Sequence, residues 1–263
     1  MSFFLAASIS LVIMSEGTPR AYDAAMHPTY SRLTSKLLST LADLDSACPE
    51  WATPKPYWVC IAGGPGSGKS TLAEAIAERV NAEQPGACVV LPMDGFHYSR
   101  SELKRLDPPD AASFLPRRGS PWTFDAEGCF AAFRAAKADG EGQMPTYSRE
   151  LSDPVPGGVR LERSHRLVLC EGNYLLGAEG EQERWAPLAT LWDETWFVRC
   201  PDAAAQRRRL IARHLETWNE EKSARWGVGE AGAAARADAN DVLNMELIRP
   251  CEARADLIID SLD

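Results

Sequence analysis

The feature of this sequence that most constrains its fold is a glycine-rich loop placed between a strand-like and a helix-like segment. Residues 63–70 read GGPGSGKS and match the pattern G-x-x-x-x-G-K-[ST]. The six residues before the loop, Tyr57 to Ala62, form a short apolar run typical of a buried strand, and a helix is expected from about Lys69 to Ala82. A strand, this loop and a helix in that order predict the phosphate-binding turn of an α/β protein.

The composition of the loop follows from the chemistry of a triphosphate. Glycines allow successive backbone N–H groups to turn towards one phosphate because no Cβ blocks the approach, and the helix N-terminus adds its positive end. Lys69 is expected to bridge the β- and γ-phosphates of ATP, while the hydroxyl of Ser70 is expected to bind Mg²⁺. The loop therefore predicts ATP and Mg²⁺ as cofactors; the alternative is a glycine-rich turn that holds no nucleotide. The residues expected to bind the nucleotide are Gly63, Gly64, Pro65, Gly66, Ser67, Gly68, Lys69, Ser70 and Thr71.

Four further short apolar runs alternate with helix-like segments along the rest of the chain. Strands made almost wholly of apolar residues and separated by helices indicate a mainly parallel sheet covered by helices on both faces. We therefore predict an α/β fold of the three-layer P-loop NTPase type. The four runs are 87–92, 166–171, 194–199 and 256–260.

Several other segments complete the expected organisation. Leucines at helical spacing predict an amphipathic helix over Thr29 to Asp45, and residues 98–124, rich in Pro, Arg and Ser, are interpreted as a long binding loop. Two short extended pieces, 144–148 and 158–162, could form a hairpin. We expect residues 1–27 to be a tail outside the core and residues 28–263 to be a single domain.

Two acidic residues follow buried strands at positions where a ligand would bind. Asp94 comes just after the run that ends at Pro92, and Glu171 ends the run that begins at Arg166. Parallel strands bring their carboxyl ends to one edge of the sheet, so both carboxylates should lie near the phosphate loop. There Asp94 could accept a proton from a hydroxyl group, and Glu171 could hold Mg²⁺ or its water shell. The alternatives are a turn residue at Asp94 and an acidic strand end without a role at Glu171.

Three motifs resemble those of one kinase family. They are the segments 92–97 (PMDGFH), 117–125 (RRGSPWTFD) and 170–176 (CEGNYLL). Together with the glycine loop they resemble the uridine kinase, phosphoribulokinase and bacterial pantothenate kinase family, and most of all its nucleoside- or fructose-transport-kinase-like branch, over about residues 30–260. The resemblance implies an ATP-dependent kinase that transfers the γ-phosphate of MgATP to a hydroxyl of a nucleoside, sugar or pantothenate-like metabolite.

The resemblance also implies roles for individual residues. The aspartate that matches Asp94 is the family's proposed base, and the glutamate that matches Glu171 lies near the metal. Arg117 and Arg118 match a basic pair near the acceptor or nucleotide. For His97 the sequence leaves two alternatives open, contact with an acceptor oxygen or with the loop backbone. The residues expected to bind the acceptor are Asp94, His97, Arg117, Arg118, Tyr147 and Arg149.

A mostly helical stretch, Pro201 to Leu247, fits the family's lid, expected at about residues 201–240. Arg209 and Arg213 are four residues apart, so they share a helix face and could both reach the transferring phosphate. The alternative is a solvated basic face. The predicted catalytic residues are Asp94, Lys69, Arg209 and Arg213. Asn240, Asp241 and Asn244 resemble a polar cluster after the lid or, alternatively, a helix cap. The charged segment 215–234 and Met245 depart from the family pattern.

Charge and cysteine content bear on partners and compartment. The formal net charge is −9 and no long basic run occurs, which argues against nucleic acid as a partner. The seven cysteines contain no C-x-x-C pair, which favours a reducing compartment, the cytoplasm. The apolar run Phe3 to Met14 is shorter than the roughly 20 residues that span a bilayer, so no membrane partner is expected. A homodimer is compatible with this interpretation. The competing class of function is a regulatory ATPase whose nucleotide state controls a protein partner.

Overall fold

The computed structural model describes residues 21–49, 51–52, 54–106, 114–177 and 180–262. The apolar run Phe3 to Met14 lies outside the described residues, as does most of the expected tail. Within the described part of the chain, none of the helices combines the length and the apolar character needed to cross a bilayer.

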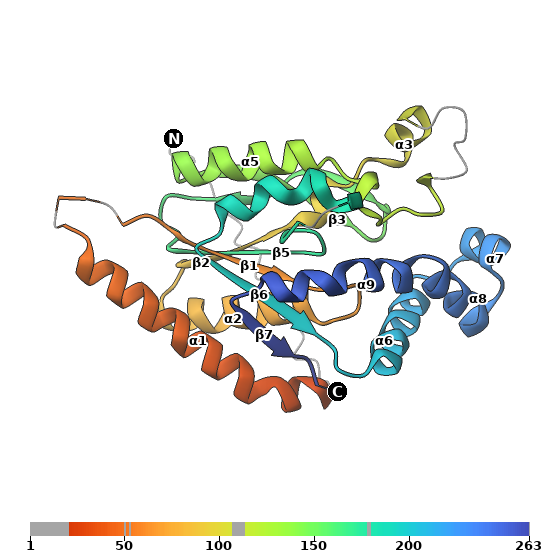
Figure 1. Cartoon of the computed structure of the whole chain (residues 1–263), viewed down its shortest axis with the longest axis horizontal. Coiled ribbons are helices and arrows are strands. Elements are labelled where there is room, and N and C mark those ends of the chain that lie inside the picture. Colours follow the sequence, from red (N-terminus) through yellow and green to blue (C-terminus); the bar gives the residue numbers. More distant parts are fainter. Residues whose placement is uncertain (1–20, 50, 53, 107–113, 178–179, 263) are drawn as a thin grey trace, which may run out of the picture.

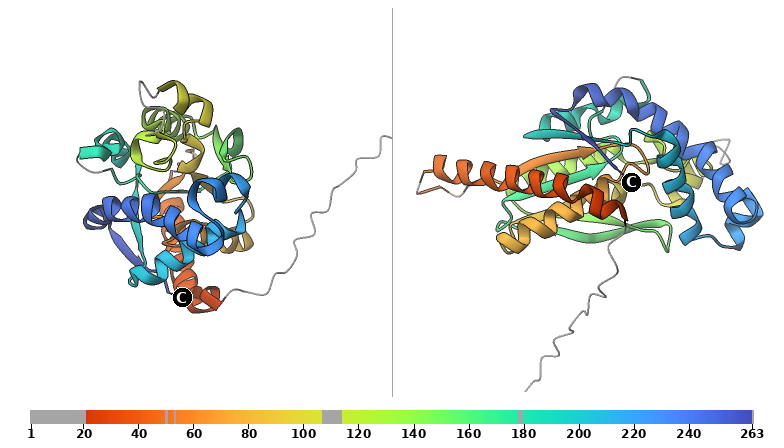
Figure 2. Two further views of the ribbon diagram at one scale, coloured as in Figure 1. Left: turned by 90° about the vertical axis from the view of Figure 1, so that its right-hand side faces the viewer. Right: turned by 90° about the horizontal axis from the view of Figure 1, so that it is seen from below.

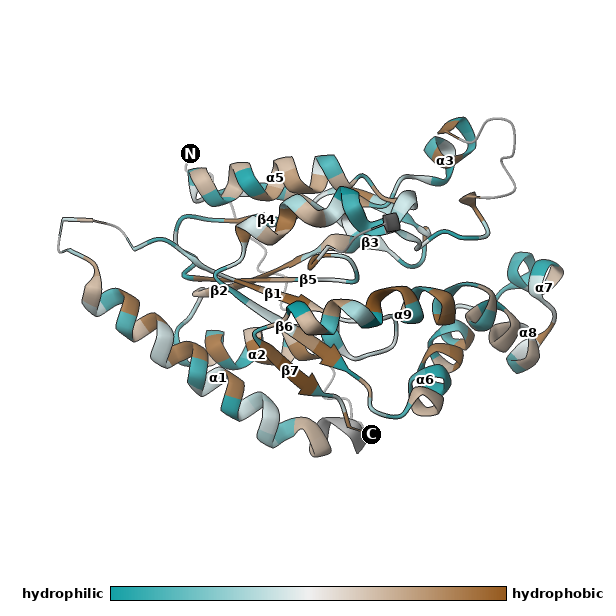
Figure 3. Cartoon of the chain, in the orientation of Figure 1, coloured by the Kyte–Doolittle hydropathy of each residue, from teal (hydrophilic) through white to brown (hydrophobic). Residues whose placement is uncertain are grey.

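Five parallel strands form the central sheet, in the order β2-β5-β1-β6-β7 (Figure 1). The phosphate-loop strand β1 lies in the middle, and all five apolar runs identified in the sequence are strands of this sheet. Figure 3 shows these strands as predominantly hydrophobic, as expected for a sheet buried on both faces. The strands are β1 (Tyr57–Ala62), β2 (Cys88–Pro92), β5 (Leu167–Gly172), β6 (Glu194–Arg199) and β7 (Leu257–Asp260).

Helices cover both faces of the sheet and give the fold its three layers. Successive side chains of β1 point to opposite faces: Val59 and Ile61 pack in the core beneath the helices α1 and α2, whereas Trp58 and Cys60 pack in the core on the α5 side. Figure 2 shows α1 and α2 running along one face. The covering elements are α1 (Ala21–Ala47), α2 (Lys69–Glu83), α5 (Ala126–Asp139), the 3₁₀ segment η3 (Gly180–Leu191) and α9 (Val242–Ile248). The α/β fold is therefore confirmed.

A separate antiparallel hairpin stands beside the sheet. Its strands are β3 (Gly142–Ser148) and β4 (Asp153–Leu161), which extend the two pieces expected from the sequence. The hairpin packs against the short 3₁₀ turn η1 (Met93–Phe96) that follows β2. Gly95 allows this contact, because a Cβ there would lie 2.0 Å from the carbonyl oxygen of Pro145. The turn that holds Asp94 is thus fixed from both sides.

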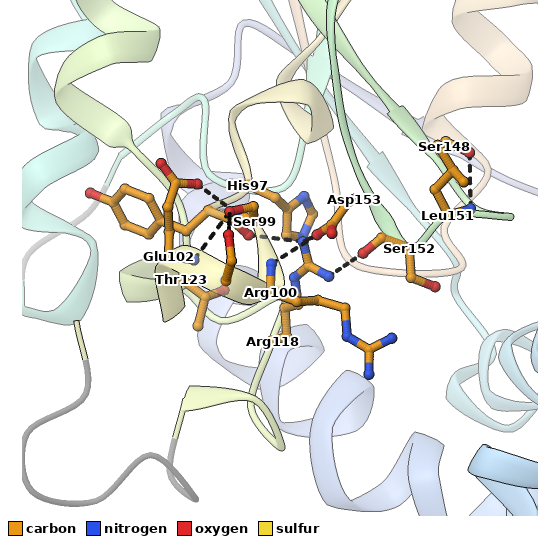
Figure 4. Close-up of polar contacts among 12 residues, drawn as sticks. His97, Ser99, Arg100, Glu102, Arg118, Thr123, Ser148, Leu151, Ser152 and Asp153 are labelled. Carbon is orange, nitrogen blue, oxygen red and sulfur yellow. Dashed lines mark hydrogen bonds and ion pairs between the residues drawn. The ribbon is translucent and has the colours of Figure 1, made fainter. Parts of the chain in front are cut away.

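The segment 98–124 contains more regular structure than expected. It includes the helix α3 (Arg100–Leu106) and the 3₁₀ turn η2 (Pro121–Thr123), while residues 107–113 lie outside the described residues. The helix begins with a capping box: Ser99 N–H donates to Glu102 Oε2 (2.7 Å), and Glu102 N–H donates to Ser99 Oγ (3.1 Å). Figure 4 shows this reciprocal pair. The segment therefore contains a short capped helix, which the pattern Ser99-Arg-Ser-Glu102 favours locally.

The helical stretch after β6 projects from the carboxyl-end edge of the sheet, as Figure 1 shows. A small core of its own holds these helices together, made of Leu210, Ile211, Ala233 and Ala237. The elements are α6 (Ala203–Glu216), α7 (Glu220–Trp226), α8 (Gly229–Arg236) and the π-helical segment η4 (Ala237–Asp241), followed by α9 and the 3₁₀ segment η5 (Arg249–Arg254). We call α6, α7 and α8 the lid.

A substitution in α1 tests whether this helix belongs to the same cooperative domain as the sheet. Leu37 is fully buried in the core shared with α2, so Leu37→Ala should lower the free energy of unfolding by about 2–5 kcal/mol. Leu44 lies on the same helix and is 38% exposed, so Leu44→Ala should cost about 0.5 kcal/mol or less. Urea denaturation should show one transition for both variants. If both variants lowered the free energy of unfolding by the same small amount, α1 would lie outside the cooperative domain.

Candidate active site

The phosphate loop connects β1 to α2 with a backbone that only glycine adopts readily. Gly66 and Gly68 have φ angles of 75° and 90°, in the left-handed region. At Gly63 a Cβ would lie 2.6 Å from the carbonyl oxygen of Val198, so the loop also needs glycine for close packing. No side chain caps the N-terminus of α2, which leaves its first N–H groups available for an anion. These features fit a bound phosphate.

Strand pairing brings two carboxylates to this loop. Glu171 of β5 is paired with Ile61 of β1 on one side and with Pro92 of β2 on the other, two residues before Asp94. The hydroxyl of Ser70, at the start of α2, donates to Glu171 Oε2 at 3.0 Å. A serine hydroxyl and a carboxylate oxygen in contact at the loop form an oxygen-only pair suited to Mg²⁺.

The charges of this cluster influence one another. Burial lowers the pKa of Lys69, against the opposing fields of Glu171 and Asp94. Burial raises the pKa of Glu171, with Lys69 acting in the opposite direction. For Asp94 burial acts to raise the pKa, but His97 first and then Lys69, Arg149 and Arg213 outweigh it and leave the pKa below its usual value. Asp94 is therefore a carboxylate at neutral pH and can accept a hydrogen bond or a proton.

His97 lies one turn after Asp94 and helps to fix it. Its Nδ1 is 2.7 Å from the carbonyl oxygen of Asp94, and because a carbonyl only accepts, Nδ1 carries the proton. The ring packs against Phe124 and Tyr147, with centroids 3.8 and 4.7 Å away. Burial lowers the pKa of His97, so the imidazole is neutral at neutral pH. The backbone contact foreseen for His97 is present, and the residue also lines the cavity described next.

A cavity of about 350 Å³ lies between the phosphate loop, the hairpin and the lid. It brings together residues from four separate parts of the sequence. Most of the residues proposed for catalysis and acceptor binding line it, together with Ser70, which was proposed for the metal. They are Lys69, Ser70, Asp94, His97, Arg118, Tyr147, Arg149 and Arg213.

The basic pair Arg117 and Arg118 divides between two environments. Figure 4 shows Arg118 clamped to the start of β4: its guanidinium donates to the carbonyl oxygen of Ser152 and to Asp153 Oδ1 (2.8 Å). Its charge is thus matched by Asp153. Arg117 donates to Ser120 Oγ (3.1 Å) and does not line the cavity. The expectation that Arg117 contacts the acceptor is not met in this structure.

The lid arginines also separate. Arg213 lines the cavity and lies 3.6 Å from Asp241, and burial lowers the pKa of its guanidinium. Arg209 lies one turn earlier on α6 and donates instead to Ser261 Oγ (2.8 Å) and to the carbonyl oxygen of Leu262 (2.9 Å). Four residues advance a helix by about 6 Å, so a shared face does not give a shared target. In this structure Arg213 lines the cavity and Arg209 does not; that both arginines could reach the transferring phosphate stays a prediction.

The polar cluster after the lid ties it to the loop that carries Arg118. Asn240 Nδ2 donates to the carbonyl oxygen of Arg118 (2.8 Å), and Ser120 Oγ donates to Asn244 Oδ1 (3.1 Å). Asp241 Oδ2 is 2.8 Å from His214 Nε2. Asn240 and Asp241 lie in the π-helical segment, a geometry that is frequent at functional sites.

Sequence reasoning missed Arg236, which ends α8 and lines the cavity. In the sequence it is one basic residue after a run of alanines, and nothing local distinguishes it from a solvated side chain. Its position depends on the packing of α8 against α6, α7 and η4. The only available signal was its place four residues before the polar cluster at Asn240.

Comparison with known proteins connects this geometry to named kinases. A family model described as Zeta toxin matches residues 40–126. A Schizosaccharomyces pombe protein provisionally named uridine kinase is 35% identical over 206 residues, which cover 77% of this chain and 82% of that protein. A pantothenate kinase of Lacticaseibacillus casei is 30% identical over 129 residues, 48% of this chain and 40% of that protein.

A solved structure agrees with these relatives. The crystal structure of a protein provisionally described as a fructose transport system kinase from Silicibacter sp. TM1040 superposes with a TM-score of 0.68 and 30% sequence identity. The match covers 87% of this chain and 98% of that one. With the phosphate loop and the kinase relatives together, the chain belongs to the uridine kinase, phosphoribulokinase and bacterial pantothenate kinase family of P-loop kinases.

Proposed function

We propose that this kinase transfers the γ-phosphate of MgATP to a hydroxyl group of a small metabolite, and that the transfer takes place in the cavity beside the phosphate loop. The observation that carries the proposal is the convergence of Lys69, Asp94 and the Ser70–Glu171 pair at one edge of the sheet. A loop that only grips a nucleotide needs no ionised carboxylate on its acceptor side. A kinase needs one that faces the acceptor hydroxyl.

The roles of the residues follow from their chemistry. MgATP, when bound, supplies the phosphoryl group and the charge of the metal. Lys69 and Arg213 offset negative charge around the γ-phosphate, and Ser70 and Glu171 hold the metal or its water. Asp94 orients the acceptor hydroxyl and accepts its proton, a contribution typically worth about 10²- to 10⁴-fold in rate.

The remaining cavity residues bind and orient rather than react. His97 and Tyr147 form a wall against which the acceptor packs, and Arg149 completes it from the hairpin side. Arg118 positions this wall, since it joins the hairpin to the loop at Tyr98. Arg209 supports the phosphate loop through Ser261, whose Oγ would lie 3.0 Å from a Cβ at Gly68.

The lid makes transfer to an acceptor faster than loss to water. It lies over the cavity and contributes Arg213, and it carries charged residues on its outer surface. Closure of such a segment excludes water and completes the charge arrangement around the phosphate. We therefore expect ATP consumption without acceptor to be slow.

Replacing Asp94 by asparagine tests the proposed base. Asp94→Asn keeps the size of the side chain but removes the charge, so acceptor-dependent ADP formation should fall by about 10²- to 10⁴-fold. The affinity for ATP should change by less than about threefold, because the phosphate loop is untouched. A coupled assay of ADP release measures the first quantity, and fluorescence titration with an ATP analogue measures the second. Asp139→Asn, on the exposed end of α5, is the control.

Wild-type rates in the Asp94→Asn variant would remove Asp94 from the mechanism. A second contrary result would come from the wild-type enzyme, if no metabolite accelerated a slow basal hydrolysis. That result would favour a regulatory ATPase over a kinase.

The Mg²⁺ requirement tests the second carboxylate. Glu171→Gln keeps the contact with Ser70 but removes the charge that attracts the metal, so the Mg²⁺ concentration for half-maximal rate should rise by about 10- to 100-fold. Glu78→Gln, on the exposed face of α2, should leave it unchanged. The measurement is a Mg²⁺ titration of the rate at saturating ATP. An unaltered Mg²⁺ requirement in Glu171→Gln would exclude Glu171 from the metal site.

A further inference from the structure

The arginines around the cavity fall into two groups by their partners. Three of the six arginines that line the cavity have a carboxylate of their own within 4 Å, and these pairs neutralise much of the positive charge. They are Arg100 with Glu221, Arg118 with Asp153 and Arg213 with Asp241. The other three, Arg149, Arg225 and Arg236, form no ion pair within the part of the chain that the structure describes; Arg149 and Arg225 are exposed, whereas Arg236 is partly buried.

Arg236 is held where its charge faces the cavity. It is half-buried at the end of α8, and burial lowers the pKa of its guanidinium, with Asp241 acting in the opposite direction. That carboxylate is already engaged by His214 at 2.8 Å and lies 3.6 Å from Arg213. Arg225, near Arg236, adds a repulsive charge. A partly desolvated guanidinium without a partner of its own is costly, so a ligand that supplied an anion would be bound strongly there.

The position of Arg236 relates it to the acceptor rather than to ATP. It shares its surroundings with Tyr147, which packs against His97, and His97 follows Asp94 by one turn. The residues placed around the donor phosphates, Lys69 and Ser70, belong to the phosphate loop and the start of α2, whereas Arg236 is near Arg213 of the lid. A small molecule with its hydroxyl at Asp94 could therefore extend along Tyr147 towards Arg236.

We propose that the acceptor is a small metabolite that carries an anionic group, a carboxylate or a phosphate, in addition to its reacting hydroxyl, and that Arg236 binds this group. This inference rests on the proposed kinase function and adds the class of substrate. The sequence pointed to Arg117 and Arg118 as the positive charge near the acceptor. In the structure Arg118 is paired with Asp153 and Arg117 does not line the cavity, so neither supplies a free cation for the acceptor. The size of the cavity, about 350 Å³ for acceptor and terminal phosphate together, favours a compact molecule.

A panel of matched acceptors tests the charge requirement. ADP release is measured with hydroxy acids of three to six carbons, with sugar phosphates, and with the uncharged alcohol or sugar that corresponds to each, together with nucleosides. At least one anionic compound should be used with a kcat/KM about 10- to 100-fold above that of its uncharged counterpart. The hydroxy acids and the sugar phosphates form separate arms, so the preferred arm identifies the anion as carboxylate or phosphate.

Variants of Arg236 then tie the preference to this residue. Arg236→Gln should raise KM for the anionic acceptor by about 10- to 100-fold while KM for ATP stays within about twofold, and Arg236→Lys should restore part of the loss. Arg207→Gln, which removes a paired lid arginine outside the cavity, should leave both KM values unchanged. Circular dichroism of each variant checks the fold.

Three results are distinguishable. Preferred use of uncharged acceptors, or an equal effect of Arg236→Gln on charged and uncharged acceptors, would overturn this inference and leave the kinase function intact. A panel in which no compound accelerates ADP release beyond basal hydrolysis would overturn the kinase proposal and this inference together. A selective loss of anionic acceptor use, partly rescued by lysine, would support both.

Discussion

The pairing of three parallel strands is the constraint on which the site depends. Because β5 lies between β1 and β2, the chain must leave β1 through the phosphate loop while Glu171 and the turn at Asp94 end beside it. The register places Glu171 opposite both Ile61 and Pro92. Backbone hydrogen bonds of a buried sheet therefore fix the distance between the anion-binding loop and the two carboxylates, and flexible side chains only complete the arrangement.

The surroundings of the two carboxyl groups, Asp94 and Glu171, shift their pKa values in opposite directions. Asp94 stays ionised because cationic groups outweigh its burial, whereas burial dominates at Glu171 and raises its pKa. Paired arginines such as Arg118 connect the hairpin to the loop after η1, and unpaired Arg236 leaves positive charge for a ligand. The acceptor side of the cavity is thus built from pieces that are distant in sequence, the hairpin, the loop after β2 and the lid.

The fold could be predicted from the sequence to a large extent, because strands buried on both faces are continuous apolar runs. The bounds of β1 and β6 match the runs 57–62 and 194–199, and the hairpin was expected in place. The phosphate loop and the strand-end acids follow from local patterns. By contrast, the direction of a long side chain depends on partners elsewhere in the fold. Arg209 turns towards Ser261, and Arg236 reaches the cavity because α8 packs against α6 and η4. The spacing of residues along the sequence does not predict the contact of Arg209 with Ser261 or the position of Arg236 in the cavity.

The central claim is that the terminal phosphate of a bound nucleotide and the carboxylate of Asp94 face each other across the acceptor position. The most direct test is a crystal structure with Mg²⁺ and a non-hydrolysable ATP analogue. The γ-phosphate should contact Lys69, the metal should contact Ser70, and Asp94 should be separated from the γ-phosphate by the space of one hydroxyl group. A nucleotide bound on the loop with Asp94 turned away from the γ-phosphate, and the acceptor position filled by protein, would contradict it.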